Sequence, residues 1–540
     1  SSLKKIFLLI FIVRRNLFVV TMRLLLPLFL TIFACGGWCN GLRILGLFPL
    51  NGKSHWVMAE RLMTSLAERG HRVDVLTHFP MKNPPPNYNQ ISLNGTLPAV
   101  VNSINRENIT QFHFNYIVYI CKRRFMSKCR NTCATNYPTI GKSKRFYILA
   151  HPRILYFFQL FAAPCYLAFG RHLNKPVIGI VTSAFHEWLS TLTGNPCNPS
   201  FMPGVFSSFG QRMTFWERLQ NTFLTNLISW QMNYYLDQQA VYVKKFFNID
   251  ASIPELYQDI AAILVNSHHS INGVRPMTTG VIEVGGLHIN ENSDPLTPEL
   301  KKWLDESTHG CIFFTFGSMV RIETFPKPVL ETFYKVFERI APVRVLMKVA
   351  QKKDLLPGLP KNVMIQSWFP QATIFKHKNI KAFITHGGLM GMLEAIYFGV
   401  PLIGIPLFGD QITNLRNAAS KNIAVNIGSV ENITEENLYN AIDTIFVQTI
   451  SKIFKDRPMS AVDTAIYWVE YVARNGFALQ SPAIHLNWWQ QNLIDVYGFI
   501  IVCLLVVFYI AVYLVKKLKN CIFGCKSCIK KQTSESKKKK

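Results

Sequence analysis

A glycine-rich turn in the second half of the chain is the first feature that could bind a ligand. Thr385–Gly388 reads THGG and follows a short apolar run, and Gly391 comes early in the helix-like block Leu389–Phe398. Glycines there let a ligand approach the backbone, and the free N–H groups at a helix N-terminus attract anions. The turn therefore predicts a phosphate-bearing ligand, although tight packing of a strand on a helix would favour the same residues.

Polar and aromatic residues stand on both sides of this turn. Trp368 and Gln371 precede it, Glu394 lies inside the helix-like block, and Asp410 and Gln411 follow a second apolar run. The succession of strand, turn, helix and strand predicts a βαβ unit with a parallel sheet. Each residue also has a purely structural explanation: Trp368 as a core aromatic, Glu394 as a surface acid, and Asp410 as a helix N-cap.

One histidine in the first half could accept a proton. Residues 42–50 (LRILGLFPL) predict a strand, and the amphipathic block Trp56–Arg69 predicts the helix that follows it. His55 is expected in the loop between them, at the carboxyl end of the strand, where doubly wound sheets bind ligands. A histidine pKa near ~6.5 suits removal of a hydroxyl proton at neutral pH. A lone loop histidine is more often just solvated.

The order of residues in the second half resembles the signature of the animal and insect UDP-glycosyltransferases. The matching pattern is W-x-P-Q…H…THGG…E…GVP…P…DQ…N, from Trp368 to Asn414. The resemblance covers residues 42–100 and 165–515, including NPCNPSFMP and VGGLHI. It implies an α/β fold of the GT-B type, with two Rossmann-like domains facing across a cleft. It also implies inverting transfer of a hexose from a UDP-sugar to small lipophilic hydroxyl compounds, as in detoxification, without a metal or other cofactor.

The resemblance implies a role for each residue around the turn. Trp368 would stack on uracil, Gln371 and Glu394 would reach the ribose hydroxyls, and Asp410 and Gln411 would hold the sugar. The helix N-terminus would bind the diphosphate, although many relatives carry serine where this chain has Gly391. The implied donor-binding residues are Ser318, Trp368, Gln371, His386, Gly387, Gly388, Gly391, Glu394, Asp410 and Gln411.

The segment 101–164 does not fit the family pattern. The resemblance makes His55 the general base and implies an aspartate immediately before Cys165 to orient it, but this chain has Pro164 there. Two explanations remain open: the enzyme is impaired in catalysis and still binds UDP-sugar, or the segment is a mis-spliced or mis-translated insertion. Its three cysteines are spaced C-x7-C-x3-C without paired histidines, a pattern that does not favour a zinc site.

Other functions are less well supported by the sequence. A nicotinamide dehydrogenase would need G-x-G-x-x-G after a strand, and none is present. A net charge of +27 would suggest nucleic acid if it were spread over a soluble domain, but much of it lies in the lysine-rich tail 516–540. The insect-like sequence favours glucose over glucuronic acid as the donor sugar, whereas the sequence does not identify the acceptor. A homo- or hetero-oligomer is compatible with the family.

Two apolar segments predict the topology. Met22 opens a signal-peptide pattern, although one long signal anchor is the alternative, and Val496–Val515 is long enough to span a bilayer. Aromatic flanks and the basic tail predict a type I protein of the endoplasmic-reticulum membrane, with lumenal domains and sequons at Asn94, Asn108 and Asn432. The expected divisions are 1–21 upstream read-through, 22–40 signal peptide, 41–280 acceptor-binding domain, 281–480 UDP-sugar-binding domain with crossing helices, 481–495 juxtamembrane segment, 496–515 transmembrane helix and 516–540 cytosolic tail.

Overall fold

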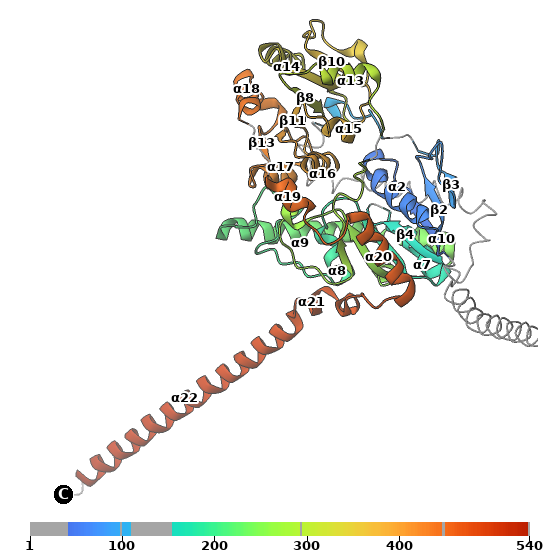
Figure 1. Ribbon diagram of the computed structural model, residues 1–540. Helices are drawn as coiled ribbons and strands as arrows, with labels where there is room; N and C mark the ends of the chain where they lie inside the picture. Colours follow the sequence, from blue (N-terminus) through green and yellow to red (C-terminus); the bar gives the residue numbers. More distant parts are fainter. Residues whose placement is uncertain are drawn as a thin grey trace, which may run out of the picture.

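The computed structural model describes residues 41–97, 100–109, 154–161, 163–291, 294–444 and 449–537. These residues form two parallel β-sheets, each covered by helices, and one long helix that leaves the body near the C-terminus (Figure 1). The expected upstream segment and signal peptide, residues 1–40, lie outside the described residues, as does most of the segment 101–164.

The first sheet has seven parallel strands in the order β3-β2-β1-β4-β5-β6-β7. Strands such as IAAILV and VIGIV are apolar throughout because helices cover both faces of a parallel sheet. The strands are β1 (Arg43–Phe48), β2 (Arg72–Thr77), β3 (Tyr88–Ser92), β4 (Ile154–Gln159), β5 (Val177–Val181), β6 (Ile260–Val265) and β7 (Val281–Glu283). The sheet thus runs to Glu283, just past the division expected at residue 280.

The strand β4 lies inside the segment 101–164, whose sequence does not fit the family pattern. It lies in the middle of the first sheet, paired with β1 and β5, and Phe157 and Phe158 are fully buried. Its sequence ILYFFQ has no apolar–polar alternation because both of its faces are buried, so periodicity could not reveal it. The part of this segment that the structure describes after residue 153 therefore belongs to the fold.

Helices from both ends of the chain cover the first sheet. α2 (Lys53–Glu68) packs against α20 (Ala461–Asn475), and both contribute to one apolar core. The chain therefore returns to the first domain after completing the second. The other helices here are α7 (Ala168–Leu173), α8 (Glu187–Thr193), α9 (Phe215–Asp237), α10 (Ala240–Phe247), α11 (Ile253–Tyr257) and α12 (His269–Asn272).

The second sheet has six parallel strands in the order β10-β9-β8-β11-β12-β13. They are β8 (Cys311–Thr315), β9 (Arg344–Lys348), β10 (Val363–Gln366), β11 (Ile380–Thr385), β12 (Leu402–Gly404) and β13 (Ala424–Asn426). The helices are α13 (Pro298–Asp305), α14 (Lys327–Arg339), α15 (Gln371–Phe375), α16 (Leu389–Phe398), α17 (Gln411–Ala419), α18 (Glu435–Asp443) and α19 (Thr449–Lys455). Two Rossmann-like sheets confirm the predicted fold class.

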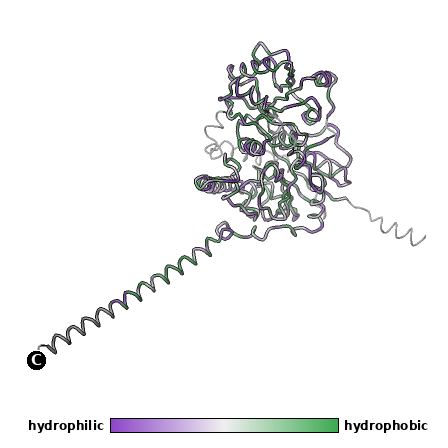
Figure 2. Tube along the Cα trace, turned by 60° about the vertical axis from the view of Figure 1, so that its left-hand side comes forward, coloured by the Kyte–Doolittle hydropathy of each residue, from purple (hydrophilic) through white to green (hydrophobic). Residues whose placement is uncertain are grey.

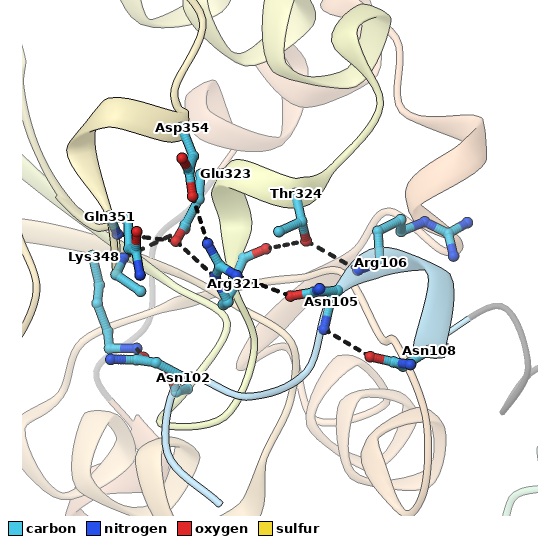
Figure 3. A network of polar contacts seen from close by, with 12 residues as sticks. Asn102, Asn105, Arg106, Asn108, Arg321, Glu323, Thr324, Lys348, Gln351 and Asp354 are labelled. Carbon is cyan, nitrogen blue, oxygen red and sulfur yellow. Dashed lines mark hydrogen bonds and ion pairs between the residues drawn. The ribbon is translucent and has the colours of Figure 1, made fainter.

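A short piece of the first half is bound to the second domain. This strap, residues 100–109, runs beside residues 318–321: the amide of Asn102 donates to the Ser318 carbonyl at 2.8 Å, and Ile104 bridges to Val320. Ile109 is buried in the core of the second domain. Figure 3 shows the polar contacts around Arg321, whose guanidinium bonds Asn105 of the strap. Position in the sequence therefore does not by itself assign a residue to a domain, because the strap precedes the second domain in the chain but packs against it.

The C-terminal helix α22 (Ile494–Lys537) leaves the body after the short helix α21 (Trp488–Gln491). Residues 494–519 contain an 18-residue segment of mean hydropathy 2.9 that is not buried, and Figure 2 shows it as a hydrophobic run outside the body. At about 1.5 Å per residue the whole stretch 494–519 is longer than the roughly 30 Å core of a bilayer. It is thus long and apolar enough to cross a membrane.

Candidate active site

A cavity of about 690 Å³ lies between the two domains. The first domain lines it with His55, Phe161, Thr182 and His186, and the second with the loops at the carboxyl ends of its strands. Ligands bind at this edge of parallel α/β sheets. Each of the following donor-site candidates lies on the cavity lining: Ser318, Trp368, Gln371, His386, Gly388, Gly391, Glu394, Asp410 and Gln411.

The glycines of the turn are required by close packing around His386. A Cβ atom on Gly317 would lie 2.6 Å from Cε1 of His386, and one on Gly388 would lie 2.8 Å from it. Gly317 and Gly387 also have φ values of 78° and 86°, in the left-handed region that favours glycine. The imidazole is therefore clamped between two backbone segments. Gly387 itself does not line the cavity but shapes the turn.

The N-terminus of α16 faces the cavity. Gly388 precedes the helix without a side-chain cap, and Leu389 to Gly391 lie on the lining. The first N–H groups of a helix have no intrahelical acceptor, and the helix dipole makes this end positive. Gly391 leaves room there, since a Cβ atom would come 3.0 Å from Nε2 of Gln371. This end of the helix can hold an anionic group.

Three further groups surround the same place. The Ser318 hydroxyl oxygen and Nδ1 of His386 are buried and have no partner within the described residues. Burial, with a smaller effect of Lys348, lowers the pKa of His386 to about 4, so the ring is neutral at pH 7. Orphaned buried polar atoms cost free energy unless a ligand pairs with them. Their position fits the oxygens of a diphosphate.

Lys348 is a candidate residue that the sequence did not reveal. It ends β9, and its ammonium group donates to the Gly317 carbonyl at 3.0 Å and to Oδ1 of Asn102 at 2.6 Å (Figure 3). Burial lowers its pKa to about 8, so it remains mostly charged at pH 7. The sequence feature that could have revealed this residue is a lysine at the end of the apolar strand RVLMK. The strap thus holds a cation beside the anion-binding turn.

Gln371 and Glu394 form one polar unit. The Gln371 amide donates to Glu394 at 2.6 Å, and Nε2 of His288 lies 3.7 Å from the other carboxylate oxygen. Burial raises the pKa of Glu394 to about 7 despite the Gln371 hydrogen bond. A carboxyl group in this state can exchange hydrogen bonds with a pair of vicinal hydroxyls. Glu394 is therefore not a surface acid, which was the purely structural explanation of this residue.

Asp410 and Gln411 lie where α17 begins. Asp410 accepts a hydrogen bond from Nδ2 of Asn414 at 3.0 Å, and its side chain does not cap the helix. The Gln411 amide oxygen accepts from the N–H groups of Leu407 and Phe408, both at 2.9 Å. Only its NH₂ group can therefore reach a ligand. Burial raises the pKa of Asp410 because its carboxylate loses contact with water. Ligand hydroxyl groups that donate hydrogen bonds to this carboxylate would replace the lost water.

Trp368 is 51% exposed although it lines the cavity. A core aromatic would be covered by its own domain, so the structural explanation for this residue is wrong. An indole that is half open to a cavity offers a face on which a planar base can stack.

His55 lies in the first turn of α2 rather than in the loop before it. The helix begins three residues earlier than predicted, at Lys53. Nδ1 of His55 lies 2.7 Å from the Thr182 hydroxyl and 3.2 Å from the Gln159 amide nitrogen. Burial lowers the pKa of His55 to about 4, below the value assumed from sequence, so the ring stays neutral at pH 7.

The expectation that position 164 faces His55 is wrong. Pro164 opens a short 3₁₀ turn (Pro164–Leu167) that is buried in the first-domain core. Gln159, the last residue of β4, reaches His55 instead because β4 is the neighbour of β1 and their carboxyl ends meet. The chain has already turned away from the sheet edge when it reaches Pro164. The residue beside the histidine is therefore an amide.

The first-domain side of the cavity, where an acceptor is expected, is apolar and aromatic. Phe161 stacks on His55 with ring centroids 5.4 Å apart, and His186 stacks on Trp188 at 4.2 Å. Val205, Phe206 and Met232 complete this side. Apart from His55, the sequence singled out none of these residues because they come from four separate segments, joined only by the fold.

Within the described residues, no group of three or more histidine, cysteine, aspartate or glutamate side chains could hold a metal ion. At the turn, the cavity is lined by the N-terminus of α16, Ser318, His386 and Lys348.

Comparisons with known proteins give the family of this chain. Residues 45–535 match the family model described as "UDP-glucoronosyl and UDP-glucosyl transferase". The chain is 36% identical to UDP-glucosyltransferase 2 of Dactylopius coccus, over 89% of this chain and 93% of the relative. It is 27% identical to UDP-glucuronosyltransferase 1A8 of Rattus norvegicus, over 93% and 95% of the two chains.

The fold is also that of a solved structure, Medicago truncatula UGT71G1 complexed with UDP-glucose. The TM-score is 0.50 at 16% identity, over 80% of this chain and 98% of that one. The cleft between two Rossmann-like sheets, the anion-binding turn and the family match together show that this chain belongs to the UDP-glycosyltransferase family.

Proposed function

We propose that this protein transfers a hexose, with inversion and without a metal, from a UDP-sugar to a hydroxyl group of a small lipophilic acceptor. The observation that carries the proposal is that His55 and the N-terminus of α16 line one cavity from opposite domains. The donor would lie on the second domain, with uracil on Trp368, ribose at Gln371 and Glu394, diphosphate at the turn, and sugar at Asp410 and Gln411.

In the transfer step, the acceptor oxygen attacks the anomeric carbon and His55 takes its proton. The bond from that carbon to the UDP oxygen breaks on the opposite face, so the configuration inverts. Negative charge develops on the departing diphosphate, where the α16 dipole, Ser318 and Lys348 stabilise it. Fixed donors of this kind need no reorganisation during the reaction.

Glucose is the proposed donor sugar. The Dactylopius coccus relative is named a glucosyltransferase. A glucuronate carboxylate would need a cation, and within the described lining the lysines are Lys53 and Lys348. Lys53 is paired with Glu60 at 3.2 Å, and Lys348 lies at the proposed diphosphate position. The aromatic lining around Phe161 and Trp188 supports a lipophilic acceptor.

A slow enzyme that binds UDP-sugar well is the second candidate, and Gln159 favours it. The Gln159 N–H group faces Nδ1 of His55 and also donates to Thr182 at 3.1 Å, so Nδ1 accepts and the ring proton lies on Nε2. To act as a base, His55 needs an unprotonated ring nitrogen that faces the acceptor hydroxyl. In addition, the neutral amide of Gln159 cannot stabilise the imidazolium by charge.

We further propose that α22 anchors the protein in the endoplasmic-reticulum membrane as a type I single-pass protein, with its domains in the lumen. The asparagines of the three sequons, Asn94, Asn108 and Asn432, are all exposed, which suits glycosylation in that compartment.

The test is an assay of the full-length protein in detergent with UDP-glucose, UDP-glucuronic acid and a panel of phenols, with and without a chelator. We expect glucoside product that survives the chelator and is lost in His55→Ala. Turnover with UDP-glucuronic acid only would contradict the donor assignment. UDP binding without turnover would leave the second candidate.

A further inference from the structure

The helix α9 presents its large apolar side chains to the outside. Trp216, Leu219, Phe223, Trp230 and Tyr234 are all more than half exposed, and we call them the α9 stripe. Their spacing of three, four, seven and four residues places them along one face of the helix. Single exposed apolar residues are ordinary, but a continuous row of large ones marks an interaction surface.

The opposite face of α9 packs against the body of the protein and fixes the orientation of the helix. Asn221 is 1% exposed, and its amide donates to the carbonyls of Pro199 and Met202 and accepts from the amide of Gly204. Thr225 is also buried. The same face also buries Ile228, Met232 and Leu236, so the body covers one face of the helix and leaves the α9 stripe on the other. The capping box of Thr214 and Glu217 fixes where it begins.

The helix α9 lies on the side of the molecule from which α22 departs. α9 packs on α8, and Gln491, the last residue of α21, donates to the Thr191 carbonyl in the last turn of α8. Figure 1 shows α9 projecting from the body on the side toward which α22 runs, and the view in Figure 2 agrees for the direction of α22. α9 and the anchor are thus attached to one short element.

We propose that the α9 stripe docks onto the surface of the same lipid bilayer that α22 enters. Tryptophan, phenylalanine and leucine on one helix face are typical of helices that lie in the membrane interface. Arg212 and Arg218, both exposed at the start of the helix, suit anionic headgroups. Trp488 and Trp489, half exposed before α22, suit the same interface. The inference rests on the proposed anchoring by α22.

Docking at α9 would hold the first domain close to the bilayer. The acceptor side of the cavity includes Met232 of α9 itself and Trp188 of α8. A lipophilic acceptor dissolved in the bilayer would then reach the cavity along elements that touch the membrane. The donor side, built by the second domain, would remain in water with its UDP-sugar.

The experiment uses the full-length chain in vesicles of phosphatidylcholine and phosphatidylserine, with a specific protease site inserted between the exposed Asn492 and Leu493. Flotation is measured before and after cleavage. We expect the cleaved body to float with the vesicles. In a variant carrying Trp216→Ser, Leu219→Ser and Phe223→Ser, we expect the floated fraction of cleaved body to fall roughly tenfold, since the interfacial anchors are gone. The matched control replaces the exposed polar residues Gln220, Thr222 and Asn226 of the same helix by serine and should still float.

The outcomes separate the two proposals. If the uncut chain floats and the cleaved body leaves the vesicles, α22 is the anchor and the docking of α9 is overturned. If the uncut chain does not float, both are overturned. If the cleaved body leaves the vesicles as a dimer that the stripe variant makes monomeric, the stripe binds a second copy instead. UDP binding by both variants checks that they are folded.

Discussion

Nε2 of Gln159 lies 3.2 Å from Nδ1 of His55, where a dyad of histidine and carboxylate would have its acid. The change Gln159→Glu supplies that acid on the same strand end with the same side-chain length. We expect kcat to rise at least about tenfold, since loss of the acid from a serine-protease triad costs about 10⁴. UDP affinity should not change, because the donor residues lie on the other domain.

Two controls accompany this variant. Gln159→Ala tests whether removing the amide alone raises turnover, and Pro164→Asp places an acid at the position where the sequence suggested one. We expect no gain from either. Unchanged, His55-dependent turnover in Gln159→Glu would show that a neutral partner is sufficient for this enzyme.

Trp368→Ala should weaken UDP binding by roughly ten- to a hundredfold, because stacking of a base on an aromatic ring is worth about 1–3 kcal/mol. Titration calorimetry of the full-length protein, with and without a chelator, measures this. The matched control is Tyr467→Ala, an aromatic ring of similar exposure outside the cavity. Binding that a chelator abolishes, or that Trp368→Ala leaves intact, would contradict the proposed site.

Gly317→Ala and Gly428→Ala separate backbone strain from crowding of His386. Both glycines have positive φ, but a Cβ atom at Gly428 meets nothing within 4 Å, whereas one at Gly317 lies 2.6 Å from the imidazole. We expect Gly428→Ala to cost about 1 kcal/mol of stability without a change in UDP affinity. Gly317→Ala should in addition lower UDP affinity at least about tenfold, because the anion-binding turn must move. Equal affinities in calorimetry would show that His386 is not part of the donor site.

The free energy of unfolding should fall as pH drops below about 6.5. Burial lowers the pKa of four cavity histidines, His55 and His288 and His386 to about 4 and His186 to about 3. Between pH 6.5 and 4 the unfolded chain therefore binds more protons than the folded one, so acid favours unfolding. One such histidine contributes roughly 2 kcal/mol of this loss by pH 5.

Glu394 acts in the opposite direction. Its pKa is raised to about 7, so between pH 7 and its ordinary value the folded state binds more protons and acid stabilises it. Burial raises the pKa of Asp410 in the same direction. Four histidines outweigh these two carboxyl groups, and we expect a net loss of unfolding free energy toward acid in urea titrations at pH 7.5, 6 and 5. His55→Gln should reduce the slope. A stability that rises toward pH 5 would contradict the burial of these rings.

Protease added to intact microsomes should remove only the proposed cytosolic tail, residues 516–540. An epitope placed near residue 300 should be protected until detergent is added, and endoglycosidase should shift the mobility of the chain. Substitution of Asn432 by Gln should remove one step of that shift, because this asparagine is exposed in a sequon. Digestion of the epitope in sealed microsomes would refute the lumenal orientation.

The sequence predicted the region around the glycine-rich turn well because its signals are local. The strands β11 and β12 and the helix α16 follow short apolar runs separated by glycine and proline, and the proposed donor residues lie within 94 positions of one another, from Ser318 to Gln411. The first domain was harder. Its acceptor side is assembled from distant segments, and β4 has no alternation because both faces are buried. Gln159 could be paired with His55 only once the strand order was known.

The return of α20 to the first domain determines which half of the enzyme is held at the membrane. After α20, Gln480 donates to the carbonyls of Gln258 and Ile260, and Ser481 donates to that of Gly194, so the segment before α22 is fastened to the first domain. The second domain has no such tie to the anchor in the described part of the chain. In the proposed topology the first domain is the half fixed to the anchor, and any widening of the cleft would displace the second domain. Exchange of UDP for a new donor would then need a movement of the second domain, whereas acceptor delivery would need no movement of the fixed half.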